Sequence, residues 1–187
     1  PGALLVFHPP VLAIGVGCER DAKPLELIEL AEKTLGDAGL TPHAVAVVVS
    51  IDLKSDEDAV HELASHFKVP ARFFSADELE SEFQRLANPS EVVFAEVGCH
   101  GVSEGSALAA VGIEGELLVE KKKSSRATCA IAKSHASIDP MAIGCAQGIL
   151  NIVGIGPGAA SWRTPQVTEI LTLADDVVGY GLYLDLV

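Results

Sequence analysis

The sequence predicts an α/β fold: a three-layer αβα sandwich with a mainly parallel sheet, followed by a truncated strand–helix–strand piece of a second α/β domain. Hydrophobic residues make up 49% of the 187 residues, whereas aromatic residues make up only 5%. Val, Ala, Leu and Ile therefore carry the apolar content, a mix typical of buried parallel strands covered by helices. Apolar runs also alternate with helical patterns across short loops, which indicates βα units.

The first expected elements are a strand, a helix and a second strand. Residues 11–17 form an apolar run that ends in a glycine turn. Pro24 suits the first position of a helix, and the apolar residues that follow recur at helical spacing. Gly36 or Gly39 is expected to end that helix, because glycine is favoured just past a helix C-terminus. Residues 44–51 then predict a second buried strand.

Two helices with capping motifs are expected around a short third strand. Ser55 followed by Asp58 reads as a capping box at the start of one helix, and Ser75 followed by Glu78 reads as another. Residues 71–74 lie between these helices and predict the third strand. The alternation of strand and helix therefore continues through this part of the chain.

The later elements are predicted from a glycine turn and from two apolar runs that a short polar stretch separates. Residues 91–97 are expected to be extended, followed by a glycine turn and a small-residue helix from about Ser103. The runs 116–123 and 126–134 are expected to be neighbouring strands. Residues 135–149 are small, mixed and aperiodic, which indicates a linker.

These elements divide the chain into four parts. Residues 1–10 are interpreted as the remnant of a preceding domain, and residues 11–134 as the main domain. The linker 135–149 then leads to residues 150–187, where a strand, a glycine turn, a helix and a second strand restart the alternation. The chain is accordingly expected to be the middle piece of a longer polypeptide.

Charge and cysteine usage exclude several classes of protein. The net charge of −13 disfavours nucleic acid and anionic membranes as partners. No apolar run reaches the length of a membrane span, and the first residues lack the basic start of a signal peptide. We therefore expect a cytoplasmic protein with reduced thiols. Its cysteines show no CxxC spacing: Cys18, Cys99, Cys129 and Cys145.

Three glycine-rich turns each join an apolar run to a helix. They span residues 15–21, 98–107 and 154–158. Such turns let backbone N–H groups and a helix N-terminus approach a phosphate or a carboxylate. None matches a complete dinucleotide-binding or P-loop fingerprint. Each turn is therefore also compatible with a tight strand–helix connection that binds no ligand. In a parallel sheet the first two would lie at the same carboxyl edge, where ligands bind.

Two polar stretches could contribute to the same edge. Asp52 and Lys54 follow the strand 44–51, so Asp52 could act as a base or orienting carboxylate and Lys54 as an anion clamp. The alternative is a polar loop that leads into a helix. Residues 120–126 form the densest basic stretch, either a solvated hairpin tip or a clamp for a multiply anionic ligand.

No metal site is predicted. His61 and His66 are five residues apart, so on a helix they lie roughly 140° apart and cannot chelate one metal ion. Cys99 and His100 could form a nucleophile and its base, but adjacent side chains seldom face each other. A buried thiol beside a loop imidazole is the alternative.

Four segments in order resemble one family. "LAIGVGCERDAKPLELIELAEKTLGDAGL", "AVVVSIDLKSDEDAVHELASHFKVPARFFSADEL", "GVSEGSALAA" and "LLVEKKKSSRATCAIAK" are similar to the C-terminal domain of CbiG, also found alone as CobE. The resemblance covers about residues 11–134. It implies cobalamin (vitamin B12) biosynthesis, in which full-length CbiG is the cobalt-precorrin-5A hydrolase that opens the ring-A δ-lactone and releases acetaldehyde. A CobE-like carrier of corrinoid intermediates, and a nucleotide-binding regulatory domain, remain as alternatives.

The last segment resembles a different family. "IVGIGPGAASWRTPQVTEILTLADDVVGYGLYLDL" is similar to the start of precorrin-3B C17-methyltransferase (CobJ/CbiH), a tetrapyrrole methylase. The resemblance implies a hydrolase–methyltransferase fusion, with S-adenosylmethionine bound only by the complete methylase domain and no cofactor for residues 11–134. It also implies that one turn belongs to the cofactor and tetrapyrrole cleft: Gly154, Gly156, Pro157 and Gly158.

The reaction implied by the resemblance, but no assignment within the family, suggests roles for the candidate residues. Lactone opening needs an activated water and a stabilised oxyanion, so Asp52 or Glu104 could be the base. The expected partners are a carboxylate-rich corrinoid, the missing CbiG domains and the rest of the methylase, and the sequence is compatible with a homo-oligomer. The residues expected to hold the substrate or its oxyanion are Gly15, Gly17, Cys18, Lys54, Val102, Ser103, Lys121, Lys122, Lys123 and Arg126.

Overall fold

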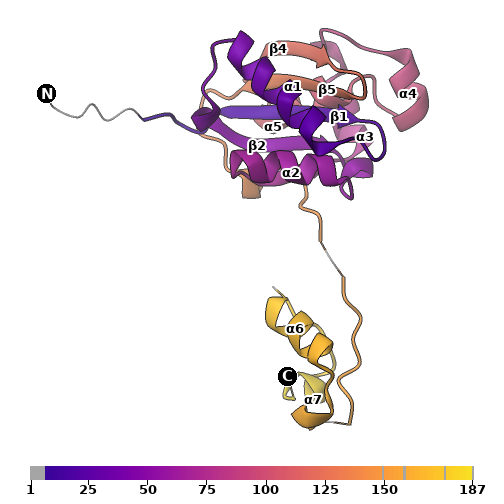
Figure 1. Cartoon of the computed structure of the whole chain (residues 1–187). Helices are drawn as coiled ribbons and strands as arrows, with labels where there is room; N and C mark the ends of the chain where they lie inside the picture. The colour runs from indigo at the N-terminus through magenta and orange to yellow at the C-terminus, as the bar shows by residue number, and fades with distance from the viewer. Residues whose placement is uncertain (1–6, 149, 158, 175, 187) are drawn as a thin grey trace, which may run out of the picture. The chain divides into compact units, whose positions relative to one another are not determined.

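The computed structural model describes residues 7–148, 150–157, 159–174 and 176–186, and the chain forms two compact units (Figure 1). The first unit ends at Gln147 and consists of a sheet with helices on both faces. The second unit begins at Gly148, and its described residues contain helices but no strand. The predicted α/β fold of the main part of the chain is confirmed.

The sheet of the first unit has the strand order β3-β2-β1-β5-β4. The pairs β1–β2 and β2–β3 are parallel, whereas β5 is antiparallel to both of its neighbours. Four of these five strands therefore share one direction, and β5 enters between β1 and β4 from the opposite end. The strands are β1 (Leu12–Cys18), β2 (Val45–Ile51), β3 (Ala71–Phe74), β4 (Glu116–Lys123) and β5 (Ala127–Lys133).

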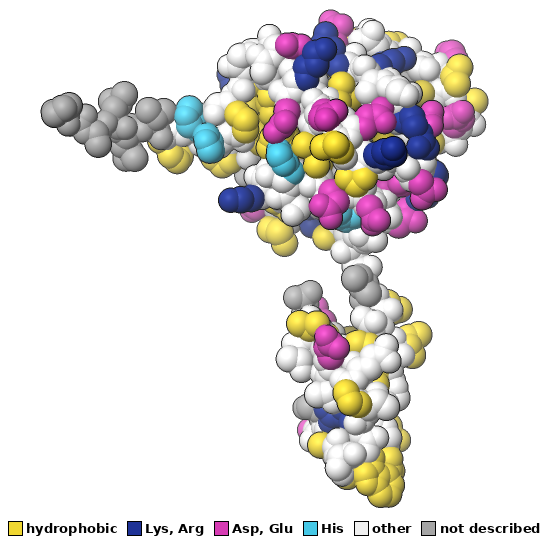
Figure 2. Space-filling view, in the orientation of Figure 1, with side chains coloured by type: hydrophobic (Ala, Val, Ile, Leu, Met, Phe, Trp, Pro, Cys, Tyr) yellow, Lys and Arg dark blue, Asp and Glu magenta, His cyan; other side chains and the backbone are white. Residues whose placement is uncertain are grey.

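The two faces of the sheet are covered by different helices. Because side chains alternate along a strand, Ile14 and Val16 of β1 pack in the core beneath α1 (Pro24–Asp37) and α2 (Asp58–Phe67). Ala13 belongs to the other core, with the residues of α5. In Figure 1, α1 and α2 lie together on the near face of the sheet. Figure 2 shows acidic and basic side chains interspersed over this face.

The helix α5 (Val102–Val111) lies unusually close to the sheet. A Cβ atom on Gly15 would lie 1.9 Å from the carbonyl oxygen of Ser103 and 2.8 Å from the Cβ of Ala107. Gly15 is thus part of β1 and makes room for the helix, instead of forming the expected glycine turn. The chain turns a few residues later, at Asp21, which has the left-handed φ of 54°.

One of the two predicted capping boxes is present in the structure. Ser75 and Glu78 form both hydrogen bonds of a capping box at the start of α3 (Ala76–Glu80). Ser55 does not cap α2, because a short 3-10 turn at Asp52–Lys54 precedes it and Glu57 occupies the N-cap position. The carbonyl of Ser55 instead accepts a hydrogen bond from His61.

Residues 91–97 form a helix, so the extended conformation expected there is wrong. α4 (Glu91–Val97) starts at Ser90, whose hydroxyl accepts a hydrogen bond from the N–H of Val93. Gly98 ends the helix in the left-handed conformation, with φ of 80°. The local valines favour a strand, but the two caps favour a helix, and no sheet neighbour competes for this segment.

Much of the predicted linker belongs to the first unit. The guanidinium of Arg72, only 7% exposed, donates hydrogen bonds of 2.8 Å to the carbonyls of Ile143 and Gly144. Phe73 and Cys145 exchange two backbone hydrogen bonds of 2.8 and 2.7 Å. Ile138 is buried as well. Residues 143–145 therefore cover the β3 edge of the sheet, Ile138 packs in the core, and this part of the chain is not a free linker.

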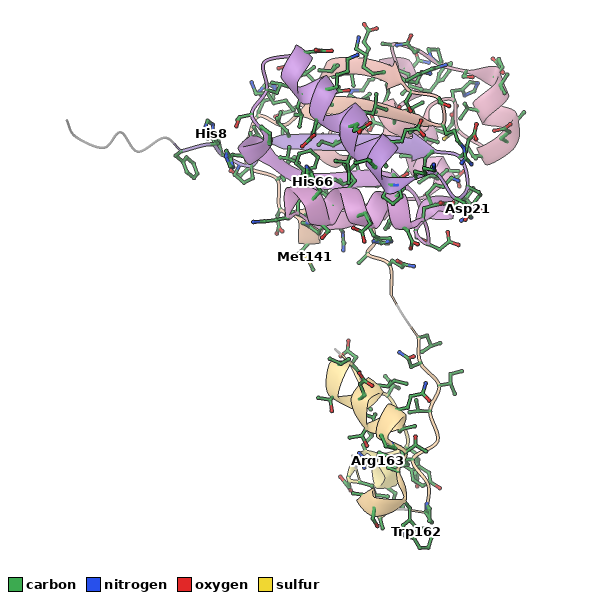
Figure 3. The ribbon with its side chains drawn as sticks, in the orientation of Figure 1. His8, Asp21, His66, Met141, Trp162 and Arg163 are labelled. Carbon is green, nitrogen blue, oxygen red and sulfur yellow. The ribbon has the colours of Figure 1, made fainter. Side chains whose placement is uncertain are left out.

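The second unit contains α6 (Pro165–Leu173) and α7 (Gly181–Leu184). A helix was expected here, but the two flanking strands do not appear in the described residues between 150 and 186. A strand needs neighbours to satisfy its backbone, and this short piece supplies none. Figure 3 labels Trp162 and Arg163 in this unit.

The 3-10 turns in the described residues are η1 (Pro42–Ala44), η2 (Asp52–Lys54), η3 (Phe83–Arg85), η4 (Pro140–Ala142) and η5 (Ala160–Trp162).

Candidate functional site

A cavity of about 500 Å³ opens at the carboxyl edge of β1 in the first unit. Its walls are the end of β1, the N-terminus of α5, the helix α4 and the turn between β4 and β5. Figure 1 shows α4 at this end of the sheet, and Figure 3 labels Asp21 in the turn that follows β1. The cavity thus lies where the carboxyl ends of parallel strands usually bind ligands.

Most of the predicted binding residues line this cavity. Gly15, Asp52, Lys122 and Glu104 do not: Gly15 lies under α5, Asp52 and Lys122 are exposed elsewhere, and Glu104 is buried. Lys122 is directed away because alternate residues of β4 face opposite sides. The predicted residues that line the cavity are Gly17, Cys18, Lys54, Val102, Ser103, Lys121, Lys123 and Arg126.

The cavity is positively charged although the chain is acidic. Five basic and two acidic side chains line it, and the buried carboxylate of Glu57 contacts two of the cations, which leaves an excess of two positive charges in a chain whose net charge is −13. A concentration of one sign of charge in a hollow attracts ligands of the opposite sign. The basic residues are Arg20, Lys54, Lys121, Lys123 and Arg126, and the acidic residues are Glu19 and Glu96.

Hydrogen bonds from Arg126 connect the β4–β5 turn to the turn that follows β1. Its Nε donates to Glu19 at 2.8 Å, and its Nη2 donates to the carbonyl of Arg20 at 2.7 Å. The carboxylate of Glu26 on α1 accepts hydrogen bonds from the hydroxyl of Ser124 and from the N–H of Arg126. The bond from Ser124, followed by that from Arg126, lowers the pKa of Glu26. Two walls of the cavity are therefore fixed to each other.

Glu57 is a site residue that the sequence analysis missed. It is 4% exposed, and its carboxylate lies 3.1 Å from Arg20 and 3.4 Å from Lys54, two of the cavity cations. It also accepts a hydrogen bond from the N–H of Asp21. The i,i+3 spacing of Lys54 and Glu57 is the sequence signal that could have revealed it.

Lys121 is held between the sheet and the loop before α4. Its Nζ donates to the carbonyl of Asn88 at 2.7 Å, and its backbone N–H donates to the carboxylate of Glu104 at 2.8 Å. Burial lowers the pKa of Lys121, while the nearby charge of Glu104 raises it and that of Lys123 lowers it. The ammonium group is thus oriented by the backbone and is partly desolvated beside the cavity.

Glu104 is buried on α5, with 1% of its surface exposed. Its carboxylate accepts bonds of 2.9 Å from the N–H groups of Ala87 and Asn88 and from the side-chain amide of Asn88, in addition to the bond from Lys121. Burial raises its pKa, but these hydrogen bonds outweigh burial and lower it. A carboxylate with four donors outside the cavity is placed to hold the cavity walls, not to activate water there.

The N-terminus of α5 forms the floor of the cavity. Gly101 is the N-cap residue and provides no side chain to cap the helix. Val102 and Ser103 follow it, and both line the cavity. The buried hydroxyl of Ser103 has no hydrogen-bond partner among the described residues.

Cys99 and His100 are engaged separately. Cys99 is fully buried, and burial raises its pKa although a hydrogen bond from Gly101 lowers it. The ring of His100 lies between Phe83 and Phe94, with centroids 4.5 and 4.4 Å away, and its Nδ1 is 2.9 Å from Glu80. This arrangement agrees with a buried thiol beside an imidazole that has a separate partner.

The remaining histidines of interest do not face each other. His61 bonds to a backbone carbonyl, and His66 pairs with Glu32 of α1 at 2.9 Å. Figure 3 labels His66 on the α1–α2 face. Within the described residues no group of three potential ligands could hold a metal ion. In that same part of the chain, no helix has the length and apolar character needed to cross a membrane.

The second unit has a hollow of its own, of about 410 Å³. Gly154 and Gly156 line it together with Tyr180 and Tyr183, and Gly156 has the left-handed φ of 74°. Pro157 is not part of the lining. Gly158 lies outside the described residues.

Comparison with known proteins gives consistent matches for the first unit. Residues 12–132 match the family model described as cobalamin synthesis G C-terminus. Protein CobE of Sinorhizobium sp is 50% identical over 121 residues, which cover 65% of this chain and 79% of that protein. A crystal structure of CobE, described as a protein from the cobalamin biosynthetic pathway, is 34% identical with a TM-score of 0.63, and the match covers 71% of this chain and 96% of that one.

Two further similarities cover smaller parts of the proteins concerned. The cobalt-precorrin-5A hydrolase of Priestia megaterium is 36% identical over 128 residues, which cover 68% of this chain and 33% of the hydrolase. The chain therefore spans about a third of the length of that protein. A stretch of 38 residues, 20% of this chain, is 47% identical to the cobalamin biosynthesis protein CobIJ of Mycobacterium tuberculosis and covers 8% of it.

Proposed function

This chain belongs to the cobalamin synthesis G C-terminus family, and we propose that its first unit binds a carboxylate-rich corrinoid intermediate of cobalamin biosynthesis in the cavity at the end of β1. The observation that carries the proposal is the charge of the cavity. Five basic side chains gather there in a chain of net charge −13. A corrinoid with several acidic side chains complements such a site, because each carboxylate meets a fixed cation or an N–H group.

Titration of the full chain tests this proposal. Cobyrinic acid, a cobalt corrinoid with free carboxylates, is added while visible absorbance and heat are recorded, and ATP and NAD serve as nucleotide controls. We expect saturable binding of cobyrinic acid that weakens as salt is raised, since the charges are screened, and no saturable binding of either nucleotide. Binding of a nucleotide but not of the corrinoid would support the regulatory alternative and overturn the proposal.

The part that this unit plays in the hydrolase reaction is a separate question. The matched hydrolase is named for cobalt-precorrin-5A, and we propose that in such a longer protein this unit supplies a substrate-binding wall. Neither Asp52 nor Glu104 lies in the cavity, which favours binding without turnover by this unit alone. A CobE-like carrier is accordingly the second candidate. Release of acetaldehyde from cobalt-precorrin-5A by this chain would identify hydrolase activity in this unit alone. Binding without release is expected both for a carrier and for a substrate-binding wall, and faster release by a hydrolase that contains this unit than by one that lacks it would identify the wall.

The end of the chain supports a proposed fusion with a methyltransferase. The short similarity to CobIJ is consistent with the start of a tetrapyrrole methylase domain. In the described residues of this unit, α6 and the short helix α7 line the hollow beside Gly154 and Gly156. We propose methyl transfer only for a complete methylase domain, of which these residues would form one part of the cofactor cleft.

A further inference from the structure

Ser103 is a buried polar residue whose hydroxyl has no partner. The residue lines the cavity, 1% of it is exposed, and its buried Oγ makes no hydrogen bond with the described residues. Leaving a buried hydroxyl unpaired costs free energy, so such groups in native proteins usually serve a ligand, an ion or a water. Ser106, on the same helix, shows the contrast: its hydroxyl bonds to the carbonyls of Val49 and Ser103.

The backbone at this helix end has free donors as well. α5 has ten residues, and no side chain caps its N-terminus. The first intrahelical bond runs from Gly105 to the carbonyl of Gly101, so the N–H groups of Val102 and Ser103 have no acceptor within the helix. A helix N-terminus also carries a partial positive charge, which favours a negatively charged ligand.

The carboxylate in the first turn of α5 does not fill this position. Glu104 is directed to Ala87, Asn88 and Lys121, away from the cavity. Lys121 and Lys123 line the same cavity and add positive charge. Two acids line the cavity: Glu19 is paired with Arg126, and Glu96 is exposed to solvent, where its charge is screened.

We infer that the N-terminus of α5 and the hydroxyl of Ser103 form a subsite for one carboxylate of the ligand. The carboxylate accepts hydrogen bonds from the N–H groups of Val102 and Ser103 and from Ser103 Oγ. The inference rests on the proposed corrinoid function for the source of that carboxylate, which is a terminal acetate or propionate group. Because the subsite offers donors and positive potential, it selects a free acid over the corresponding amide or ester.

A pair of variants of the full chain tests the subsite. Ser103→Ala removes the unpaired hydroxyl, and Ser106→Ala removes a hydroxyl of the same helix that lies outside the cavity. Binding of cobyrinic acid and of its methyl ester is measured for both variants. We expect Ser103→Ala to weaken binding of the acid by about tenfold, the size of a hydrogen bond to a charged group, and to leave binding of the ester unchanged. Ser106→Ala is expected to change neither.

A second measurement does not depend on the corrinoid. Propionate is titrated into ¹⁵N-labelled full-length chain, with propionamide as the neutral control. We expect the amide resonances of Val102 and Ser103 to shift with propionate, to shift less in Ser103→Ala, and to stay in place with propionamide. Shifts with propionate but no binding of cobyrinic acid would keep the subsite and overturn the proposed function. Binding of cobyrinic acid that Ser103→Ala leaves unchanged, with no propionate shift, would overturn the subsite alone.

Discussion

At the scale of single residues, the buried charge of Glu104 is stabilised mainly by hydrogen-bond dipoles, with the ammonium group of Lys121 close enough to interact with it. The N–H groups of Ala87, Asn88 and Lys121 and the amide of Asn88 all point at its carboxylate. An ionised carboxylate can remain buried only when such bonds replace the water it has lost. These bonds join α5, β4 and the loop before α4, so one side chain fixes three parts of the cavity.

We predict that Glu104→Gln destabilises the chain by about 2–4 kcal/mol, because the amide cannot accept all four bonds and leaves buried donors unpaired. The folded-state pKa of Glu104 is below its unfolded value. Its stabilising effect is therefore complete above the unfolded pKa of about 4.3 and is lost as pH falls through the lower folded pKa. Urea unfolding at pH 7 and at pH 3 checks both statements. Glu29→Gln, on the exposed face of α1, is the control, and an equal loss in both variants would contradict the prediction.

A second prediction at this scale concerns the cavity cations. Lys123→Gln is expected to weaken binding of cobyrinic acid by about two- to fivefold, the effect of one partly screened charge, without a change in stability. Lys33→Gln removes an exposed charge on α1 and should leave affinity unchanged. Calorimetric titration at low and at high salt measures both variants. If Lys33→Gln weakened binding as much as Lys123→Gln, general charge and not the cavity would be responsible.

At the scale of elements, the fit of α5 against the sheet depends on the absence of a side chain at one position of β1. Replacement of Gly15 by alanine would place a methyl group against the backbone of Ser103, and backbone yields less readily than a side chain. The floor of the cavity and the packing of the core are thus set by the same contact.

We predict that Gly15→Ala lowers the free energy of unfolding by about 3 kcal/mol or more, because the overlap displaces α5. Gly36→Ala provides a matched control near the end of α1, where a Cβ would meet no atom within 4 Å. That variant is expected to be neutral or stabilising by about 0.5–1 kcal/mol, from the better helix propensity of alanine. Thermal and urea unfolding compare the two. A Gly15→Ala chain as stable as the wild type would refute the role assigned to this contact.

The elements also show what sequence can and cannot predict. The strands were predicted because their residues are apolar at every position or alternate in a simple way, and most cavity residues followed from the shared edge of parallel strands. The sequence of α4 is misleading because its valine-rich composition favours a strand, whereas its two caps favour a helix. Sequence alone does not reveal the structural role of Glu104, a candidate base, because the three residues that donate its four hydrogen bonds are distant along the chain.

At the scale of the whole molecule, the two units differ in how many residues of their helices and strands are buried. All seven residues of β2 are buried, whereas α6 has no buried residue. The short second unit therefore has few interactions to oppose local unfolding.

We predict that the amides of α6 exchange with solvent orders of magnitude faster than those of β2, since local opening of an unburied helix costs little free energy. Hydrogen exchange followed by mass spectrometry or NMR on the full chain measures this difference. Slow exchange in α6 comparable to β2 would contradict the prediction and would indicate pairing with another chain.

The position of β5 has a consequence for the order of folding. β5 pairs with β1 along its whole length, from Leu12 opposite Lys133 to Cys18 opposite Ala127, so the central strand receives one of its two neighbours from the far end of the unit. During synthesis, β1, β2 and β3 emerge long before this partner, and one edge of β1 stays open until residues 127–133 have left the ribosome. Such late, long-range closure slows folding and exposes an apolar edge in the meantime. The nascent chain therefore completes its core only after nearly the entire first unit has been made.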